Sequence, residues 1–133
     1  MNIRIYYEDT DCGGVVYYAN YLKYFERART HYLEERGCSV TELMEQGTQF
    51  RVTHAELTYR SAAMYGEDLH ITTTLSVNRR TSLTFSHKIQ ERKTSRLVVE
   101  GTATLVAVNS QGRAKRLSPD MLKDLGAERE TNS

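Results

Sequence analysis

Apolar side chains recur at every second position over much of the chain after residue 49. The alternation runs over residues 50–59, 69–77, 83–89 and 97–108. This period is typical of β-strands that bury one face. The short polar segments NRRTS and QERKTS join the last three of these strands, and such connections place consecutive strands antiparallel. The pattern therefore predicts an antiparallel sheet as the main layer of the fold.

Residues 19–36 have a helical period instead. Leu22, Phe25 and Tyr32 fall on one side of this segment, and Gly37 stands where a helix commonly ends. A one-sided apolar stripe of this length needs a large surface to pack against, and the sheet provides one. We therefore predict an α+β fold in which one long helix lies against an antiparallel sheet.

Shorter elements are expected around this framework. Alternation over residues 3–7 predicts a short first strand. Ser39, followed three residues later by Glu42, predicts the start of a short helix. Ser118 and Pro119 predict the start of another helix near the C-terminus.

Apolar residues also fall on the second face of the last strand, at Val98, Val106 and Val108. One helix covers only part of one face of a sheet, so an apolar second face or a free edge favours association. A homodimer or a homotetramer is therefore expected, since closed symmetric oligomers are the commonest assemblies.

Length, charge and hydropathy limit the class of protein. The 133 residues suit one domain spanning residues 1–133, with a frayed tail expected over about 127–133. The 18 Lys and Arg nearly balance the 17 Asp and Glu, which does not favour a nucleic-acid partner. No apolar run approaches the roughly 18 residues of a membrane span. The acidic N-terminal segment and the two cysteines favour a cytoplasmic location.

Several common kinds of catalytic or ligand site have no signature here. The four histidines (His31, His54, His70 and His87) fall on separate predicted elements without metal-ligand spacing. No GxSxG elbow is present for a serine nucleophile, and no GxxxxGK[ST] loop for a nucleotide triphosphate. We therefore expect neither a metal nor a cofactor.

The most distinctive stretch is residues 6–29, YYEDTDCGGVVYYANYLKYFERAR. It reads as a strand end, an acidic glycine turn and the start of the long helix. Glycines let a backbone approach a ligand closely, and a helix N-terminus offers unpaired N–H donors to an oxygen that gains negative charge. Asp11 precedes these donors, where a nucleophile or base is useful. Alternatively, Asp9 and Asp11 only cap the turn while the tyrosines pack the helix.

Within this stretch, YEDTDCGGVVYYANYLKYFERAR closely resembles the signature YxDTDxxGVVYHxxYLxYxERAR of the 4-hydroxybenzoyl-CoA thioesterase family, in its YbgC-type acyl-CoA thioesterase branch associated with the Tol–Pal system. The match is dense over about 23 residues. The later segment RRTSLTF is similar to the turn that this branch places before its fourth strand. The resemblance implies the hotdog fold, in which an antiparallel sheet wraps a long helix and protomers pair edge to edge.

The resemblance also implies roles for individual residues. Asp11 matches the catalytic aspartate, which either attacks the thioester carbonyl as a nucleophile or activates a water as a general base. Tyr18 matches the residue at the helix entry whose backbone N–H points at that carbonyl. Gly14 matches the residue that keeps the turn open. Val15 and Tyr17 are expected to contact the substrate.

Two positions depart from the pattern of the branch. Tyr18 stands where the branch commonly has His, so a backbone contact to the carbonyl survives while a proton-carrying imidazole does not. Cys12 stands where a small residue is usual. A thiolate beside a helix N-terminus is a possible nucleophile, but the neighbouring Asp11 charge raises a thiol pKa, which favours Cys12 as a space-filler.

Coenzyme A carries a 3′-phosphate and a pyrophosphate, which suit arginine forks and lysine. We expect Arg79, Arg80, Thr81 and Ser82 to bind these phosphates. A second basic cluster consists of Arg113, Lys115 and Arg116. Ordinary surface solvation is the alternative for both groups.

The expected function is hydrolysis of a short-chain or aromatic acyl-CoA to the free acid and CoA, at a site near a subunit interface. Acyl-CoA is the expected partner, and acyl carrier protein is a second candidate. The alternative is a non-catalytic binding or scaffold protein of the same fold that holds acyl-CoA or acyl carrier protein.

Overall fold

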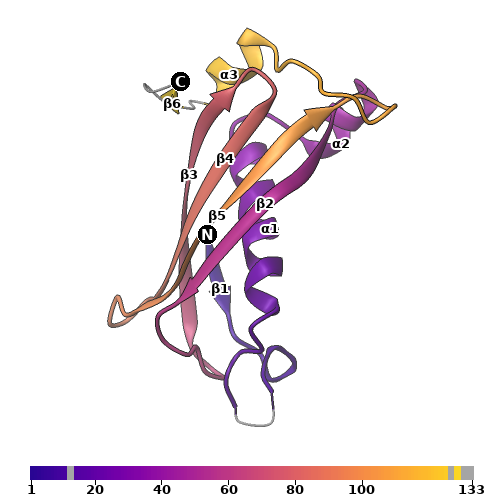
Figure 1. The fold of residues 1–133 in the computed structure, drawn as a ribbon. Helices are drawn as coiled ribbons and strands as arrows, with labels where there is room; N and C mark the ends of the chain where they lie inside the picture. The colour runs from indigo at the N-terminus through magenta and orange to yellow at the C-terminus, as the bar shows by residue number, and fades with distance from the viewer. Residues whose placement is uncertain (12–13, 126–127, 130–133) are drawn as a thin grey trace.

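The computed structural model describes residues 1–11, 14–125 and 128–129 (Figure 1). In chain order, its elements are β1 (Asn2–Arg4), the 3₁₀ helix η1 (Tyr7–Asp9), α1 (Asn20–Glu35), α2 (Val40–Glu45), β2 (Gln49–Tyr59), β3 (Asp68–Arg79), β4 (Ser82–Glu91), β5 (Leu97–Val108), α3 (Pro119–Leu125) and β6 (Glu128–Arg129).

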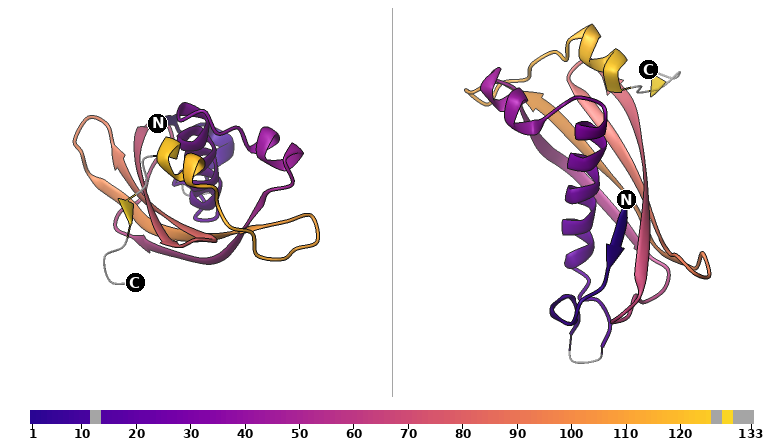
Figure 2. Two further views of the ribbon diagram at one scale, coloured as in Figure 1. Left: turned by 90° about the horizontal axis from the view of Figure 1, so that it is seen from above. Right: turned by 180° about the vertical axis from the view of Figure 1, so that it is seen from behind.

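The strands form one six-stranded sheet in the order β1-β3-β4-β5-β2, with β6 paired to β3 outside this path. β3, β4 and β5 pair antiparallel in succession, as their short connections predict. β2 pairs antiparallel with β5 and ends the order, so one of its edges faces outward. α1 runs along one face of the sheet (Figures 1 and 2), which confirms the predicted α+β class.

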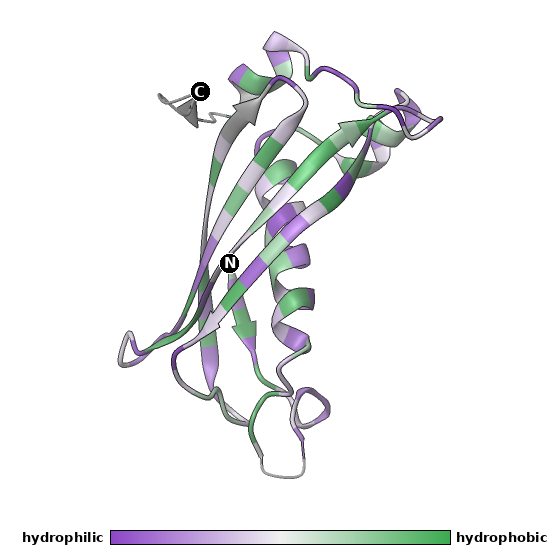
Figure 3. Cartoon of the chain, viewed as in Figure 1, coloured by the Kyte–Doolittle hydropathy of each residue, from purple (hydrophilic) through white to green (hydrophobic). Residues whose placement is uncertain are grey.

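The core lies between α1 and the sheet. Figure 3 shows apolar and polar residues alternating along the strands, as the two-residue period predicts. From α1, the buried side chains are Tyr21, Tyr24, Phe25, Ala28, Tyr32 and Leu33. The sheet contributes Leu69, Ile71, Leu75, Leu83, Phe85, Ile89, Val99 and Ala103 among others. Burial of these two faces against each other is the main driving force for the fold.

Gly101 gives α1 the room to approach the sheet. It pairs with His87 on β4 and with Leu57 on β2. A Cβ atom built at Gly101 would lie 2.9 Å from Cε2 of Phe25 and would also overlap the carbonyl oxygen of Glu56. The missing side chain at this position is therefore a requirement of helix–sheet packing.

The prediction that Val98 and Val108 lie on an uncovered second face of the last strand is wrong. Ile89 on β4 faces Val99, and the next residue of β4 faces Leu97, so Val98 is an extra residue on β5. Such a bulge changes which way a side chain points, and both Val98 and Val99 are fully buried. Val108 is buried because the returning chain after β5 pairs with it.

The first strand is shorter than the alternation over residues 3–7 predicts. β1 ends at Arg4. The Asp9 carboxylate accepts a hydrogen bond from the Tyr6 backbone N–H at 2.9 Å, and η1 begins at the next residue. A local side-chain interaction with the backbone thus ends the strand.

The two short helices begin where their caps predict. The Ser39 hydroxyl accepts a hydrogen bond from the Glu42 N–H at 3.4 Å, at the start of α2. The Ser118 hydroxyl accepts one from the Met121 N–H at 3.1 Å, at the start of α3. In the described part of the chain, no helix combines the length and the apolar character that crossing a membrane requires.

Candidate active site

The turn that carries Asp11 lies at one end of the molecule, next to the start of α1 (Figure 1). The Asp11 N–H donates to the Val15 carbonyl at 2.9 Å, and the Gly14 N–H donates to the Asp11 carbonyl at 3.1 Å. Gly14 adopts a φ of +77°, where a side chain is strained. Asp11 is exposed on this turn, and Cys12 lies outside the described residues.

Directly after the turn, the main-chain N–H groups at the entry to α1 differ in their hydrogen-bond partners. The Asn20 N–H donates to the Tyr17 carbonyl at 2.9 Å, and the Tyr21 N–H donates to the Tyr18 carbonyl at 3.3 Å. The N–H of Tyr18 itself donates to no acceptor among the residues that the structure describes. The Tyr18 N–H thus lies just before the N-terminus of α1, which carries a partial positive charge, at the same end of the molecule as the Asp11 turn.

Asp9 caps the turn, as one interpretation of the sequence predicts for both Asp9 and Asp11. Its carboxylate accepts from the Tyr6 N–H at 2.9 Å. Its carbonyl accepts from the Tyr17 N–H at 3.0 Å and from Nδ2 of Asn20 at 2.8 Å. Burial and the Asp9 carboxylate raise the pKa of Tyr24. Asp9 therefore joins the turn to α1.

Exposed tyrosines surround the turn. The Tyr17 and Tyr18 rings are 4.8 Å apart, and Tyr18 meets Tyr59 at the end of β2 edge-on, with ring centroids 6.5 Å apart. Tyr7 and Tyr65 form a second edge-on pair at 6.0 Å. We call these five residues the tyrosine surface. They are exposed, so they offer aromatic contacts to a ligand or a partner.

The turn is docked on the loop of residues 61–67. The contacts are a hydrogen bond from Val16 N to Ala63 O (2.8 Å), one from Tyr65 N to Gly14 O (3.1 Å), and an isolated β-bridge between Val15 and Met64. No residue of this loop carries a sequence motif. Main-chain contacts of this kind leave no signal in residue type, so sequence patterns do not reveal them.

The residues expected to bind CoA phosphates lie far from Asp11 in the same chain. The β3–β4 turn, which carries Arg80 and Thr81, lies beside α3 at the opposite end of the molecule (Figure 1). The carbonyls of Arg80 and Thr81 accept hydrogen bonds of 2.8 Å from β5 and the segment after it. Ser82 is buried, and the side chain of Arg79 lies outside the described part. One chain alone does not bring these residues to Asp11.

Lys115, from the second basic cluster, has a structural contact. Its Nζ donates to the Thr48 hydroxyl at 2.7 Å and to the Gln46 carbonyl at 3.3 Å. These bonds tie the segment after β5 to the end of α2. Lys115 and Arg116 line a cavity of about 300 Å³ between these two segments, also far from the Asp11 turn.

A second hollow is a groove of about 480 Å³ beside β2, α1 and α2. Its lining includes Leu33, Leu43, Phe50, Val52 and Arg29. Burial lowers the pKa of Arg29 below its usual value. The groove is thus mainly apolar, with the Arg29 guanidinium and the Glu26 carboxylate both in its wall, and it lies along the outer edge of the sheet.

His87 is a buried polar residue in the middle of the core. Its ring stacks on Phe25 with centroids 4.5 Å apart, and its Nδ1 lies 3.0 Å from the Thr73 hydroxyl. Nε2 has no hydrogen-bond partner among the described residues. Burial, aided by the positive charge of Arg29, lowers the pKa of His87 to about 3. His87 is therefore neutral in the folded protein at physiological pH.

This neutrality makes stability depend on pH. The unfolded chain binds a proton at His87 below its ordinary pKa of about 6.5, whereas the folded chain does not until about pH 3. The free energy of unfolding is therefore expected to fall by about 2 kcal/mol between pH 6.5 and pH 4.5 through this residue. Urea denaturation at several pH values measures the fall.

A matched pair of variants isolates the His87 contribution. His87→Phe keeps a ring on Phe25 and should reduce the acid-induced loss, whatever its effect at neutral pH. His54→Gln changes an exposed histidine that pairs with Glu56 and should keep the loss of the parent protein. An identical pH slope in His87→Phe and the parent would contradict the assignment.

The other histidines also lie away from the turn. His31 pairs with Glu35 at 2.7 Å, His54 with Glu56 at 2.7 Å, and His70 with the Asn2 side chain at 2.8 Å. Among the described residues, no group of three or more His, Cys, Asp or Glu side chains is placed to hold a metal ion.

Comparison with known proteins supports the same family. A model of the thioesterase-like superfamily matches residues 6–125. The acyl-CoA thioester hydrolase YbgC of Escherichia coli O6:H1 is 36% identical over 117 residues, which cover 88% of this chain and 87% of that protein. The acyl-CoA thioesterase YbgC of Haemophilus influenzae is 35% identical over 114 residues, covering 85% of this chain and 82% of that protein.

A solved structure agrees with these relatives. The DHNA-CoA thioesterase of Staphylococcus aureus superposes with a TM-score of 0.87 at 26% identity, covering 95% of this chain and 87% of that one. The predicted hotdog fold and the resemblance to the YbgC-type branch are confirmed. The turn with Asp11 and the long helix fall inside the matched region, and the chain belongs to the thioesterase-like superfamily.

Proposed function

We propose that this chain hydrolyses acyl-CoA thioesters to the free acid and CoA, with Asp11 as the catalytic carboxylate. The observation that carries the proposal is the exposed Asp11 on a turn that leads directly to Tyr18, whose N–H has no acceptor within the described ranges of the chain. The YbgC relatives, which are named as acyl-CoA thioesterases, support the reaction class.

In the proposed reaction, the thioester oxygen accepts a hydrogen bond from the Tyr18 N–H, which stabilises the negative charge that develops there. The Asp11 carboxylate attacks the carbonyl carbon, forms a mixed anhydride and releases the CoA thiolate, and water then cleaves the anhydride. In the alternative route, Asp11 removes a proton from a water that attacks the carbonyl directly. Both routes yield the acid and CoA.

The exchange of His for Tyr at position 18 is compatible with either route. Residue 18 contributes its backbone N–H, and this group does not depend on the side chain. The Tyr18 ring instead joins the tyrosine surface, where it contacts Tyr17 and Tyr59. The proposed mechanism therefore operates without an imidazole at this position.

A second copy of the chain completes the site in this proposal. Two β2 edges that pair antiparallel about a two-fold axis bring the Tyr59 end of one copy beside the Gln49 end of the other. Tyr59 contacts Tyr18, so the Asp11 turn of one copy would face the apolar groove beside α2 of the other. The tyrosines and this groove suit a short-chain or aromatic acyl group.

The same two-fold arrangement also suggests which residues bind the CoA phosphates. It brings the far end of the second copy, with Arg79, Arg80, Thr81 and Ser82, toward the Asp11 end of the first. Phosphate binding by these residues is therefore proposed across the dimer and not within one chain. Sedimentation of the purified protein as a monomer would exclude this arrangement.

Thiol release from a panel of acyl-CoAs tests the proposal. We expect hydrolysis of butyryl-CoA and benzoyl-CoA, and slower hydrolysis of palmitoyl-CoA, because the exposed rings suit small or aromatic groups. An uninhibited reaction is expected in the presence of a chelator, since the proposed chemistry uses a carboxylate and amides. Silence over the whole panel, with acyl-CoA binding retained in equilibrium dialysis, would favour the non-catalytic binding protein instead.

A further inference from the structure

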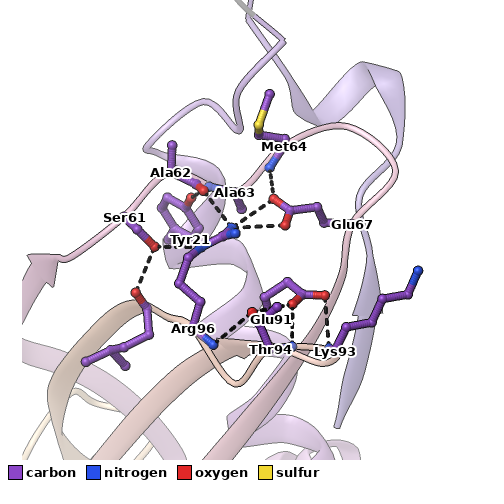
Figure 4. A network of polar contacts seen from close by, with 11 residues as sticks. Tyr21, Ser61, Ala62, Ala63, Met64, Glu67, Glu91, Lys93, Thr94 and Arg96 are labelled. Atoms are coloured by element: carbon purple, nitrogen blue, oxygen red, sulfur yellow. Dashed lines mark hydrogen bonds and ion pairs between the residues drawn. The ribbon is translucent and has the colours of Figure 1, made fainter.

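A single guanidinium joins both ends of the loop on which the Asp11 turn is docked. Arg96 lies just before β5, and its Nε donates to the Ser61 hydroxyl at 3.1 Å (Figure 4). Its Nη2 donates to the Ala62 carbonyl at 3.0 Å and to both carboxylate oxygens of Glu67, each at 3.0 Å. One side chain thus closes residues 61–67 into a ring.

Further hydrogen bonds hold the loop in the same conformation. Oε1 of Glu67 also accepts from the Met64 N–H at 2.7 Å, and the Ser61 hydroxyl donates to the Leu97 carbonyl at 2.8 Å (Figure 4). The Ala63 N–H donates to the buried Tyr21 hydroxyl at 3.4 Å. The main chain of residues 61–67 is therefore fixed against both α1 and β5.

Arg96 is itself held by the turn between β4 and β5. The Glu91 carboxylate accepts from the N–H groups of Lys93 and Thr94 and from the Thr94 hydroxyl, at 3.0, 2.8 and 2.7 Å. These bonds lower the pKa of Glu91 to about 2. The Thr94 hydroxyl accepts from the Arg96 N–H at 3.3 Å, and Ser95 has a φ of 61°. The turn therefore presents Arg96 in a defined direction.

The position of the loop also determines the position of the Asp11 turn, because the two are hydrogen-bonded. Ala63 and Tyr65 are the loop residues that form hydrogen bonds with Val16 and Gly14, which follow Asp11 in the turn. A shift of the loop would therefore move the turn relative to α1, because α1 is held on the sheet by its own buried side chains and, among the described residues, forms a hydrogen bond with the loop only through the Tyr21 hydroxyl. A displacement of about 1 Å at reacting groups can lower a rate by about 10².

We propose that Arg96 is a positioning residue: with Glu67, it fixes loop 61–67 and thereby holds the Asp11 carboxylate in line with the Tyr18 N–H. This inference rests on the proposed thioesterase function. Arg96 is exposed, at 39%, and Glu67 is partly buried, at 21%, and an ion pair with this much solvent access contributes little to stability. Its effect is therefore on geometry at the turn more than on folding.

Steady-state kinetics with a matched control test the role. Arg96→Ala should lower kcat by about tenfold or more and leave KM within about threefold, because the loss affects alignment and not substrate binding. Arg96→Lys should be intermediate, since an ammonium replaces the charge but not the fork. Arg60→Ala breaks an exposed pair with Glu100 (2.8 Å) that does not reach the loop, and should change kcat by less than about twofold.

Two further measurements separate positioning from general destabilisation. Amide hydrogen exchange at Val16 and Tyr65 should accelerate by about tenfold in Arg96→Ala, while the amide of Phe25 in α1 stays protected. Arg96→Ala should also lower kcat no further in an Asp11→Asn background, because it acts through Asp11.

The outcomes distinguish this inference from the function on which it rests. Unchanged kcat and unchanged exchange in Arg96→Ala, with an active wild type and an impaired Asp11→Asn, overturn the positioning role alone. A wild type inactive over the whole acyl-CoA panel overturns the proposed function and the catalytic part of the role, and the exchange data then decide whether Arg96 fixes the loop.

Discussion

Replacement of Asp11 by Asn is expected to lower kcat for acyl-CoA hydrolysis by at least about 10². An amide neither attacks a carbonyl carbon effectively nor takes a proton from water, so both proposed routes lose their carboxylate. The main-chain bonds of the turn, from Asp11 to Val15 and from Gly14 to Asp11, do not involve the side chain and should persist. Thiol release at saturating butyryl-CoA or benzoyl-CoA measures the loss.

Glu8→Gln is the matched control for this variant. Glu8 is an exposed acid in the same segment, and the candidate site does not use it, so kcat should change by less than about twofold. Turnover by Asp11→Asn within about threefold of wild type, a margin of about 0.6 kcal/mol, would remove Asp11 from the mechanism.

The second large effect is expected at the contact between α1 and the sheet. Gly101→Ala should lower the free energy of unfolding by about 3 kcal/mol, the upper end of the range for overpacked cores. The new Cβ would press on the Phe25 ring at 2.9 Å and on the Glu56 carbonyl, and a main-chain atom in a paired strand cannot move aside cheaply. Urea denaturation of the parent and the variant measures the difference.

Two control variants show whether the loss of stability is specific to the contact at Gly101. Thr74→Ala, on the exposed side of β3, should cost less than about 1 kcal/mol. Adding Phe25→Leu to Gly101→Ala relieves the ring contact but not the one with Glu56, so it should not recover wild-type stability. A loss below about 1 kcal/mol in Gly101→Ala would show that the helix does not need this close approach.

The sequence predicted the elements whose signals are local. The long helix and the alternating strands appear where expected, and Phe25 and Tyr32 of the helical stripe are buried, because a periodic apolar face has to meet a core. The prediction is wrong for Leu22, which is 48% exposed, because the buried face of α1 runs through Tyr21, Tyr24 and Phe25 instead. The caps at Ser39 and Ser118 also appear, since each hydroxyl accepts a hydrogen bond from the N–H three residues further along the chain. Such features need no knowledge of distant parts of the chain.

The irregular features of the sheet were not predictable in the same way. Alternation alone does not show that Val98 is an extra residue on β5, because the bulge becomes evident only when β4 is paired beside it. The early end of β1 likewise depends on a hydrogen bond between Tyr6 and Asp9 that competes with strand pairing. Both departures arise from interactions that a two-residue period does not encode.

In the candidate site too, residues close together in the sequence were predictable, whereas contacts between distant segments were not. Asp11, Gly14 and Tyr18 lie in one continuous turn and helix start, so the sequence places them together. Arg79–Ser82 were predicted to bind the CoA phosphates because of their residue types, but the fold places their turn at the opposite end of the molecule from Asp11. Arg96 carried no signal, since its partners come from separate segments that only the folded chain assembles.

The way in which the Asp11 turn is docked has a consequence for the evolution of the chain. Its contacts with residues 61–67 are made by N–H and carbonyl groups, so Val15, Met64 and Tyr65 can change their side chains without breaking them. If the proposed site is correct, these side chains can be exchanged, by selection or by engineering, to alter acyl selectivity while the main-chain geometry of the turn stays the same.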